Sequence, residues 1–360
     1  MSSVYNFYAG PAVIFDEVLR RAEEEFFDFA GTGMSVLEIS HRAKAFDRVM
    51  IEAETNMKEL MGLGDDYRVL FLQGGASTQF SMIPMNFLKN GRADYILTGS
   101  WSKKAFAEAK KIGDTSVAFD GGDENFSRIP KQEELMFSDD PVYVHMTTNN
   151  TIFGTEFNYI PDTPAPLVAD MSSDILSKPL DFQRFALIYA GAQKNLGPAG
   201  VTAVVIRRSF LETADQNVPA TMLKYATHAE KNSLYNTPPV FSVYLLNLVL
   251  RHLKDLGGLP AIAEVNQRKA GYIYDAIDGS GGFYRGHAQK DSRSLMNITF
   301  TMANEESEKK FVAEGEQEGF IGLKGHRSVG GLRASVYNAM PEEGAKALAD
   351  FMKEFMRKNG

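Results

Sequence analysis

Short apolar runs alternate with amphipathic segments along the first 256 residues. Runs such as Val69–Leu72 and Tyr95–Thr98 are too short for helices and rich in strand-forming residues, which predicts buried strands. The same reasoning predicts strands at Ser116–Phe119, Val142–Met146, Leu167–Met171, Ala186–Ala190 and Val201–Ile206. Helical periods between the strands predict helices at Asp16–Ala30, Ala43–Met61, Gln79–Leu88 and Ser102–Lys111. This alternation indicates an α/β domain whose mainly parallel sheet carries helices on both faces.

The pattern changes near the pair Gly257-Gly258. Longer amphipathic helices are predicted beyond it at Leu259–Ile277, Glu305–Glu318 and Glu342–Lys358, with strands at Met296–Phe300 and Leu332–Ser335. We therefore predict a large domain over residues 16–256. A smaller α+β domain is predicted over residues 257–360, with residues 1–15 packed on it.

The composition of the chain limits the classes of function that it can have. The chain has 360 residues, of which 44% are hydrophobic and 23% charged, as in ordinary globular proteins. Its net charge of -8 argues against nucleic-acid or anionic-membrane partners, because both bind basic faces. It contains no cysteine, which excludes disulfides, thiolate metal sites and cysteine nucleophiles. We found no signal peptide and no membrane-spanning run, so we expect a cytoplasmic enzyme without a metal ion.

One lysine stands out from the others. Lys194 lies in a connector rich in Gly, Ala and Pro, between the predicted strands Ala186–Ala190 and Val201–Ile206. Most lysines are solvated, but small neighbours let other atoms approach closely, and a dry amine has a lowered pKa and is a nucleophile. We interpret Lys194 as the anchor of an aldehyde cofactor.

Other polar residues follow predicted strands, where α/β proteins bind ligands. Gly74–Thr78 connects a strand to a helix and is either a phosphate loop or only a turn. Asp170 either caps a turn or pairs with a protonated pyridine nitrogen. Trp101 is either a core residue or a plate for an aromatic cofactor. Thr151 and Gln193 occupy comparable strand ends.

A set of cations occurs in irregular, Gly-containing segments of this acidic chain. Its members are His41, Arg42, His326, Arg327 and Arg333. Because Arg grips carboxylate and phosphate with two parallel hydrogen bonds, the set predicts a substrate that carries both groups.

The ordered set of motifs resembles the phosphoserine aminotransferase family, class-V aminotransferases that use pyridoxal phosphate and have the aspartate-aminotransferase fold. The resemblance covers essentially the whole chain. It is carried by Asn6–Ala12, Ile39–Arg42, Gln73–Ser77, Gly99–Trp101, Ala169–Ser173, Tyr189–Ala199, Tyr235–Pro239 and Gly325–Ser335.

The resemblance implies a role for each candidate residue. Lys194 links covalently to pyridoxal 5'-phosphate, Asp170 pairs with the ring nitrogen, Trp101 stacks on the ring and Thr151 touches its hydroxyl side. The cofactor phosphate is held by Ala76, Ser77 and Gln193, with Asn236 and Thr237 from a second subunit. The resemblance therefore also implies a homodimer with shared active sites. Arg42 and Arg333 bind substrate carboxylate, and His41, His326 and Arg327 receive substrate phosphate.

The implied reaction transfers the amino group of glutamate to 3-phosphohydroxypyruvate, a phosphorylated 2-oxo acid of serine biosynthesis. The products are O-phospho-L-serine and 2-oxoglutarate. The alternatives are an aminotransferase of the same fold with another carboxylate substrate, and a nucleotide-binding α/β protein that forms no imine.

Overall fold

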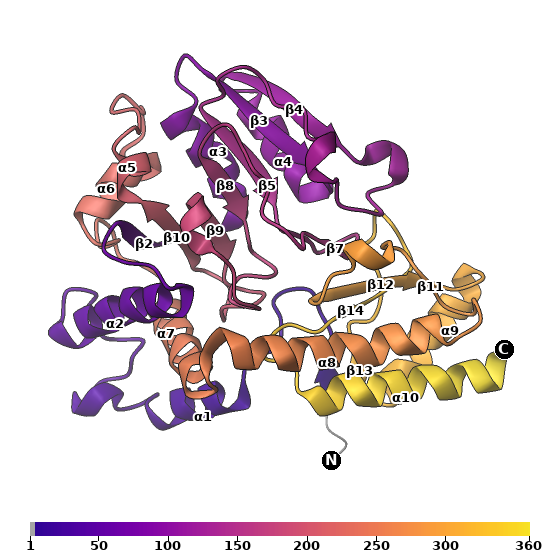
Figure 1. The fold of residues 1–360 in the computed structure, drawn as a ribbon. Coiled ribbons are helices and arrows are strands. Elements are labelled where there is room, and N and C mark those ends of the chain that lie inside the picture. The colour runs from indigo at the N-terminus through magenta and orange to yellow at the C-terminus, as the bar shows by residue number, and fades with distance from the viewer. Residues whose placement is uncertain (1–3) are drawn as a thin grey trace.

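A seven-stranded sheet forms the centre of the computed structural model, which describes residues 4–360 (Figure 1). In spatial order its strands are β2 (Tyr67–Leu72), β10 (Thr202–Arg207), β9 (Phe185–Gly191), β8 (Leu167–Asp170), β5 (Tyr143–Thr147), β3 (Arg92–Leu97) and β4 (Asp114–Asp120). Only β10 runs antiparallel to its two neighbours. The predicted mainly parallel sheet is thus confirmed.

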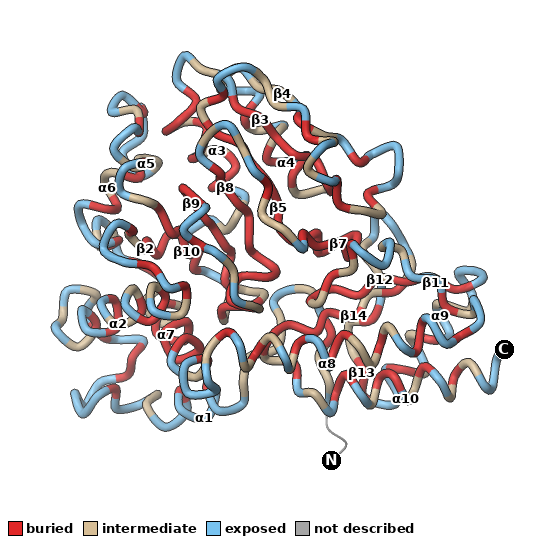
Figure 2. Tube along the Cα trace, in the orientation of Figure 1, coloured by how far each residue is buried: buried red, intermediate tan, exposed pale blue. Residues whose placement is uncertain are grey.

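Helices cover both faces of this sheet because its strands are apolar on both sides. Along β9, Ile188 and Ala190 pack into one buried cluster, and Leu187 and Tyr189 pack into another. The first cluster includes residues of α1 (Asp16–Glu24), α2 (Lys44–Met61) and α7 (Val240–Asp255). The second includes residues of α3 (Gly75–Phe87), α4 (Ser100–Ala109), α5 (Arg208–Leu211) and α6 (Tyr225–Glu230). Figure 2 shows the strands as the buried centre of this layer.

The C-terminal part builds a separate hydrophobic cluster around a three-stranded sheet. Its elements are β11 (Arg285–Gly286), β12 (Asn297–Thr301), β14 (Leu332–Ser335), α8 (Gly258–Asp278), α9 (Glu305–Gln317) and α10 (Glu342–Asn359). Near the N-terminus, β1 (Tyr5–Asn6) pairs in parallel with β13 (Phe320–Ile321), and Phe7 is fully buried in the same cluster. Leu259 and Ile262 at the start of α8 instead pack on the large sheet.

Helix α8 therefore connects the two clusters, and the predicted boundaries at residues 15–16 and 256–257 stay a prediction. Residues 1–3 of the predicted small domain lie outside the described residues. A short two-stranded ribbon, β6 (Asn149–Asn150) with β7 (Thr155–Glu156), follows β5.

Two predicted helices differ most from the structure in their bounds. The helix predicted over Asp16–Ala30 ends at Glu24. The helix predicted from Gln79 begins at Gly75, because Gly74 adopts a left-handed conformation (φ 92°) at the N-cap. The predicted end of α2 is confirmed, with Gly62 left-handed at the C-cap.

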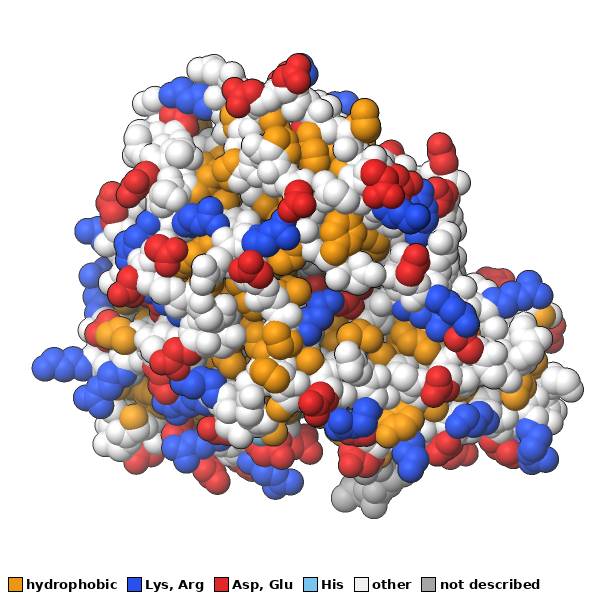
Figure 3. Space-filling model, in the orientation of Figure 1, with side chains coloured by type: hydrophobic (Ala, Val, Ile, Leu, Met, Phe, Trp, Pro, Cys, Tyr) orange, Lys and Arg blue, Asp and Glu red, His pale blue; other side chains and the backbone are white. Residues whose placement is uncertain are grey.

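Acidic and basic side chains are interspersed over the face of the molecule in Figure 3. Within residues 4–360, no helix is both long and apolar enough to cross a bilayer.

Candidate active site

The candidate residues gather at one edge of the large sheet. The parallel strands β2, β9, β8, β5 and β3 all have their carboxyl ends there, which is where ligands bind in α/β sheets. Asp170 is the last residue of β8, and Lys194 lies three residues beyond β9. Thr151 follows β5, and Trp101 follows β3 in the first turn of α4.

The side chain of Lys194 is partly buried, and its amine lies beside Thr151 and Trp101. Its Nζ donates a hydrogen bond to Thr151 Oγ1 at 2.8 Å and lies 5.4 Å from the centre of the Trp101 ring. Burial lowers the pKa of Lys194 to about 8, although the carboxylate of Asp170 acts in the opposite direction. A lysine in this state has a large uncharged fraction near neutral pH, which suits it for attack on an aldehyde.

Asp170 is buried and fixed in orientation. Its Oδ1 accepts hydrogen bonds from the backbone amide of Ser172 at 2.9 Å and from Ser172 Oγ at 2.6 Å. Ser172 Oγ also accepts the Gly191 amide at 3.1 Å, which ties the end of β8 to the end of β9. Burial raises the pKa of Asp170, while Lys194 and the Ser172 hydrogen bonds oppose that rise. A cationic ligand group at this carboxylate would restore its charge balance.

Trp101 presents its ring to the same space. The ring packs against the buried side chains Phe126, Ile152 and Phe153, and its Nε1 is buried without a hydrogen-bond partner. Lys104, one helical turn later, places its Nζ 4.4 Å from the ring centre. The sequence analysis did not identify Lys104 as a site residue. The only signal for it is its position three residues after Trp101 on a predicted helix, which places the two side chains on the same face.

The N-terminus of α3 offers backbone donors at the same edge. Gly74 caps the helix, and the amides of Gly75, Ala76 and Ser77 in the first turn have no partner within the helix. Free amides and the helix dipole favour an anion at this point. A Cβ on Gly74 would lie 1.9 Å from Thr78 Oγ1, so the turn requires glycine.

Asn236 and Thr237 lie beside this helix start in their own chain. Asn236 Nδ2 donates to Gln73 Oε1 at 3.2 Å, and Gln73 Nε2 donates to the Thr237 carbonyl at 3.2 Å. The carbonyl of Gln193 accepts the Ala12 amide at 2.9 Å, and its side chain is half-buried.

One of the candidate cations, Arg333, lies near Lys194, and His326 lies near Arg333 and Arg327. Arg333, on β14, donates from Nη1 to the carbonyl of Thr151 at 3.3 Å, and its Nε is buried without a partner. Burial lowers the pKa of Arg333. Burial also lowers the pKa of His326, and the nearby charges of Arg333, Arg327 and Lys104 lower it further. These cations can receive an anionic substrate.

His41 and Arg42 lie elsewhere, just before α2. His41 Nε2 is buried without a hydrogen-bond partner, and Arg42 is exposed. Within residues 4–360, no hydrogen bond or ion pair connects either side chain to Lys194, Asp170 or Arg333. The contacts described within one chain thus do not link this predicted pair to the other candidate residues.

Two further segments hold the lysine loop in place. Gly10 packs so closely that a Cβ there would lie 3.3 Å from Lys194 Cγ, and the carbonyl of Ala9 accepts a hydrogen bond from Tyr337 Oη at 2.9 Å. Asn195 Oδ1 accepts the Asn338 amide at 2.8 Å. The Asn6–Ala12 motif was the only sequence signal for these contacts.

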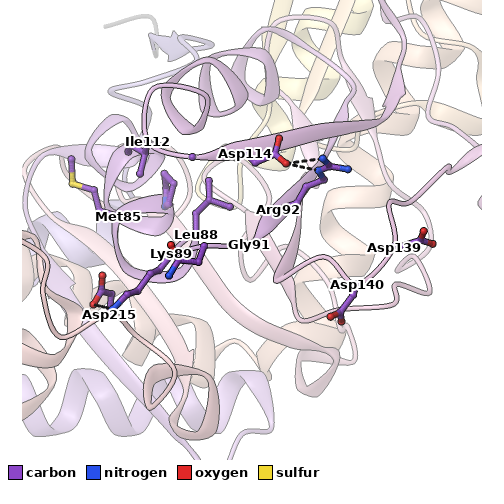
Figure 4. Close-up of a pocket in the computed structure, with 13 residues that line it drawn as sticks. Met85, Leu88, Lys89, Gly91, Arg92, Ile112, Asp114, Asp139, Asp140 and Asp215 are labelled. Atoms are coloured by element: carbon purple, nitrogen blue, oxygen red, sulfur yellow. Dashed lines mark hydrogen bonds and ion pairs between the residues drawn. The ribbon is translucent and has the colours of Figure 1, made fainter.

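A hollow lies away from this site, at the amino ends of β3 and β4 (Figure 4). Its volume is about 780 Å³. Its cations are paired, Arg92 with Asp114 at 2.7 Å and Lys89 with Asp215 at 3.0 Å. It contains neither Lys194 nor Asp170, so it is not part of the candidate site.

Comparison with known proteins agrees with this geometry. The family "Aminotransferase class-V" matches residues 4–348. The chain is 60% identical to phosphoserine aminotransferase of Herpetosiphon aurantiacus, over 99% of this chain and 100% of that protein. It is 52% identical to phosphoserine aminotransferase of Bacillus subtilis, over the full length of both.

Solved structures show the same likeness. Phosphoserine aminotransferase from Bacillus circulans subsp. alkalophilus superposes with a TM-score of 0.98 at 54% identity, over the full length of both chains. The phosphoserine aminotransferase of Trichomonas vaginalis with bound pyridoxal phosphate superposes with a TM-score of 0.93 at 38% identity, over 98% of this chain and 100% of that one.

Proposed function

This chain belongs to the class-V aminotransferases, and we propose that it transfers an amino group between glutamate and 3-phosphohydroxypyruvate, giving O-phospho-L-serine and 2-oxoglutarate. It is a pyridoxal-phosphate-dependent aminotransferase. The observation that carries the proposal is the dry amine of Lys194, placed between Thr151, Trp101 and the Asp170 carboxylate with Arg333 alongside.

The residues present fit this cofactor at several points. Asp170 is a buried carboxylate that lacks a contacting cation among the described residues, and a protonated pyridine nitrogen would supply one. Trp101 offers a flat apolar face. The free amides of Ala76 and Ser77 suit a phosphate, to which we also assign Gln193. Pyridoxal phosphate, when bound, supplies an aldehyde that condenses with amines and a ring that withdraws electrons from the substrate Cα.

Lys194 and Asp170 divide the proton chemistry. With the cofactor bound, Lys194 Nζ would take the proton from the substrate Cα as general base and give it to the former aldehyde carbon of the cofactor as general acid. Its lowered pKa matches this role, because the best catalytic base has a pKa near the working pH. The Asp170 carboxylate holds a proton at the ring nitrogen and thereby stabilises negative charge that develops at Cα. The Thr151 hydroxyl orients the amine.

The cations determine which substrates are accepted. Arg333 is assigned to the substrate α-carboxylate, because its side chain lies closest to Lys194 through Thr151. His326 and Arg327 are assigned to the distal anion, which is a phosphate in one substrate and the γ-carboxylate of glutamate in the other. The N–H donors of an Arg guanidinium or a His imidazole can bind either anion.

We assign His41 and Arg42, together with Asn236 and Thr237, to an active site shared by two copies of the chain. Exposed apolar side chains occur along the same segment as His41, namely Phe27, Met34, Leu37 and Ile51. Exposed apolar side chains gathered in this way favour an interface with a partner. The intrachain contact of Asn236 with Gln73 is the competing explanation for its position.

Subunit mixing distinguishes these two explanations. A hybrid of Lys194→Ala and Asn236→Ala chains regains one intact site only if Asn236 serves the partner's lysine, so activity should rise on mixing. The control is a mixture of Lys194→Ala with Asp170→Asn, whose residues belong to one site, and it should stay inactive. Equal recovery in both mixtures, or in neither, contradicts the shared site.

Substrate preference tests the reaction itself. The purified protein, loaded with pyridoxal phosphate, should convert glutamate and 3-phosphohydroxypyruvate to O-phosphoserine with a higher kcat/KM than it shows for unphosphorylated 2-oxo acids. A preference for an unphosphorylated acid would support the alternative, an aminotransferase with another carboxylate substrate. We also expect the protein in the cytoplasm, where serine biosynthesis takes place.

A further inference from the structure

A second buried carboxyl group lies close behind Asp170. Asp174 is only 3% exposed and sits in the turn that follows β8. Its Oδ1 lies 2.6 Å from the Oγ1 of Thr148, which is also buried. The same Thr148 Oγ1 lies 3.1 Å from the backbone carbonyl oxygen of Asp170. Thr148 therefore connects the two aspartates.

The hydroxyl of Thr148 has one hydrogen, yet it contacts two oxygens that are usually acceptors. If Asp174 were ionised, the single hydrogen would have to be shared between its carboxylate and the Asp170 carbonyl. If Asp174 carries a proton, it donates to Thr148, and Thr148 donates to the Asp170 carbonyl. The Asp170 carbonyl also accepts the backbone amide of Thr148 at 3.1 Å, and only the second arrangement gives both contacts of the Thr148 hydroxyl a hydrogen as well.

The surrounding charges favour the protonated acid. The nearest cation, Lys178, forms an ion pair with the buried Glu156, whose other oxygen accepts the Leu295 amide at 2.8 Å. Asp174 makes no ion pair among the described residues, and it shares its surroundings with the negative groups of Glu156 and Asp170. Lys194 and Tyr337 are the other titratable groups that respond to its charge.

Burial also favours the protonated form of Asp174. Loss of hydration raises the pKa of Asp174 to about 8 and the negative charge of Glu156 adds to the rise, against the opposing effects of the Thr148 hydrogen bond and the Lys178 charge. Two ionised carboxylates buried side by side repel one another, which favours protonation of the one without a cation.

We propose that Asp174 is a neutral, proton-bearing acid whose hydrogen bond through Thr148 positions Asp170, so that Asp170 alone presents a negative charge to the cofactor nitrogen. This inference rests on the proposed function for its consequence. The protonation state itself can be tested without any turnover. Asp174 is a positioning residue, because it contacts neither the substrate nor the assigned cofactor groups.

Carbon-13 NMR of protein labelled at the aspartate carboxyl carbon measures the protonation state. We expect one aspartate resonance at the chemical shift of a protonated acid at neutral pH, in both cofactor-free and cofactor-loaded protein. Asp174→Asn should remove that resonance and leave the others in place. A spectrum in which every aspartate is ionised at neutral pH overturns the proposal, and this measurement needs only the wild-type chain.

Two neighbouring carboxyl groups provide a matched pair of variants. Asp174→Asn replaces a neutral donor with a neutral amide donor, so at neutral pH the thermal midpoint and the visible absorbance of the loaded protein should stay as in the wild type. Glu156→Gln removes a charge that Lys178 requires, and it should lower the thermal midpoint. A changed visible spectrum of Asp174→Asn at neutral pH means that a negative charge was lost there, and it overturns the proposal.

Variants of Thr148 test the connection to Asp170. Thr148→Ser keeps the hydroxyl and should preserve the visible titration and the affinity for pyridoxal phosphate. Thr148→Val removes both hydrogen bonds and should weaken cofactor binding about tenfold, the effect of one lost buried hydrogen bond. Equal affinities for the Ser and Val variants would contradict a positioning role. Failure of the proposed reaction would leave the NMR result unchanged, so the two proposals fail separately.

Discussion

Asn195 Oδ1 accepts the backbone amide of Asn338 at 2.8 Å, which fixes the residue after Lys194 to the loop that follows β14. That loop is in turn held by Lys269, a buried residue of α8. Its Nζ donates to the carbonyls of Tyr337, Asn338 and Met340 at 2.7, 3.3 and 3.2 Å. The position of the reactive lysine thus depends on a lysine in the other hydrophobic cluster.

Lys269→Met should destabilise the protein by about 2–4 kcal/mol, because three buried carbonyls lose their donor while the side-chain volume is kept. Chemical denaturation of the cofactor-free protein measures this. Lys353→Met, at an exposed position of α10, is the control and should change stability little. Equal effects of the two variants would contradict the structural role of Lys269.

Lys194 should react with amine reagents at lower pH than the other lysines. Its pKa of about 8 means that the uncharged, reactive fraction rises as the pH increases through 8, whereas ordinary lysines need pH values above 10. Competitive acetylation of cofactor-free protein, read by peptide mass spectrometry across pH, measures the midpoint. A midpoint for Lys194 equal to that of exposed lysines such as Lys309 contradicts the dry environment.

Lys194→Ala should abolish turnover and leave a folded protein that binds pyridoxal phosphate only noncovalently. Without the Lys194 amine, the site lacks the side chain that we assign to imine formation with the cofactor. Borohydride reduction of the wild type followed by peptide mapping should place the label on Lys194. A label on a different lysine would refute the assignment.

His326→Ala and Arg327→Ala should reduce kcat/KM more for the phosphorylated substrate than for glutamate. A phosphate carries more negative charge than the γ-carboxylate. Removal of hydrogen-bond donors should therefore weaken the binding of the phosphorylated substrate more than that of glutamate. Steady-state kinetics with each substrate gives the two ratios. Arg333→Ala serves as the comparison, since a residue assigned to the α-carboxylate should affect both substrates similarly.

Gly74→Ala should weaken pyridoxal-phosphate binding by about tenfold or more, because the new Cβ would lie 1.9 Å from Thr78 Oγ1 in a residue with φ 92°. Fluorescence titration of cofactor-free protein measures the affinity. Gly281→Ala has a positive φ of 62° but no neighbour within 4 Å, so it controls for backbone strain alone. Unchanged affinity in Gly74→Ala would argue against a phosphate at α3.

The sequence predicted the sheet well because its strands are short, apolar and bounded by glycine, as at Val69–Leu72. It also singled out Lys194 and Asp170, whose roles stay a prediction, because Asp170 ends such a strand and Lys194 lies three residues beyond the next one. It missed the early end of α1 at Glu24, where the helical period continues into an irregular turn. The sequence could not predict contacts between residues that are distant along the chain. Nothing near Asp174 in the sequence indicates its contact with Thr148, and nothing near Lys269 indicates that it binds the loop after β14.

The reversed direction of β10 has a consequence for how the lysine moves. Gly191 and Thr202 face each other in one ladder, and the Ala192 amide bonds the Val201 carbonyl at 3.0 Å, so the Lys194 segment is a closed hairpin loop. Because hydrogen bonds close this loop at its base, its backbone can move little. The Lys194 amine must therefore move by rotation about the bonds of its own four-carbon side chain. This rotation lets the amine leave a hydrogen-bond partner and return to the same position in every turnover.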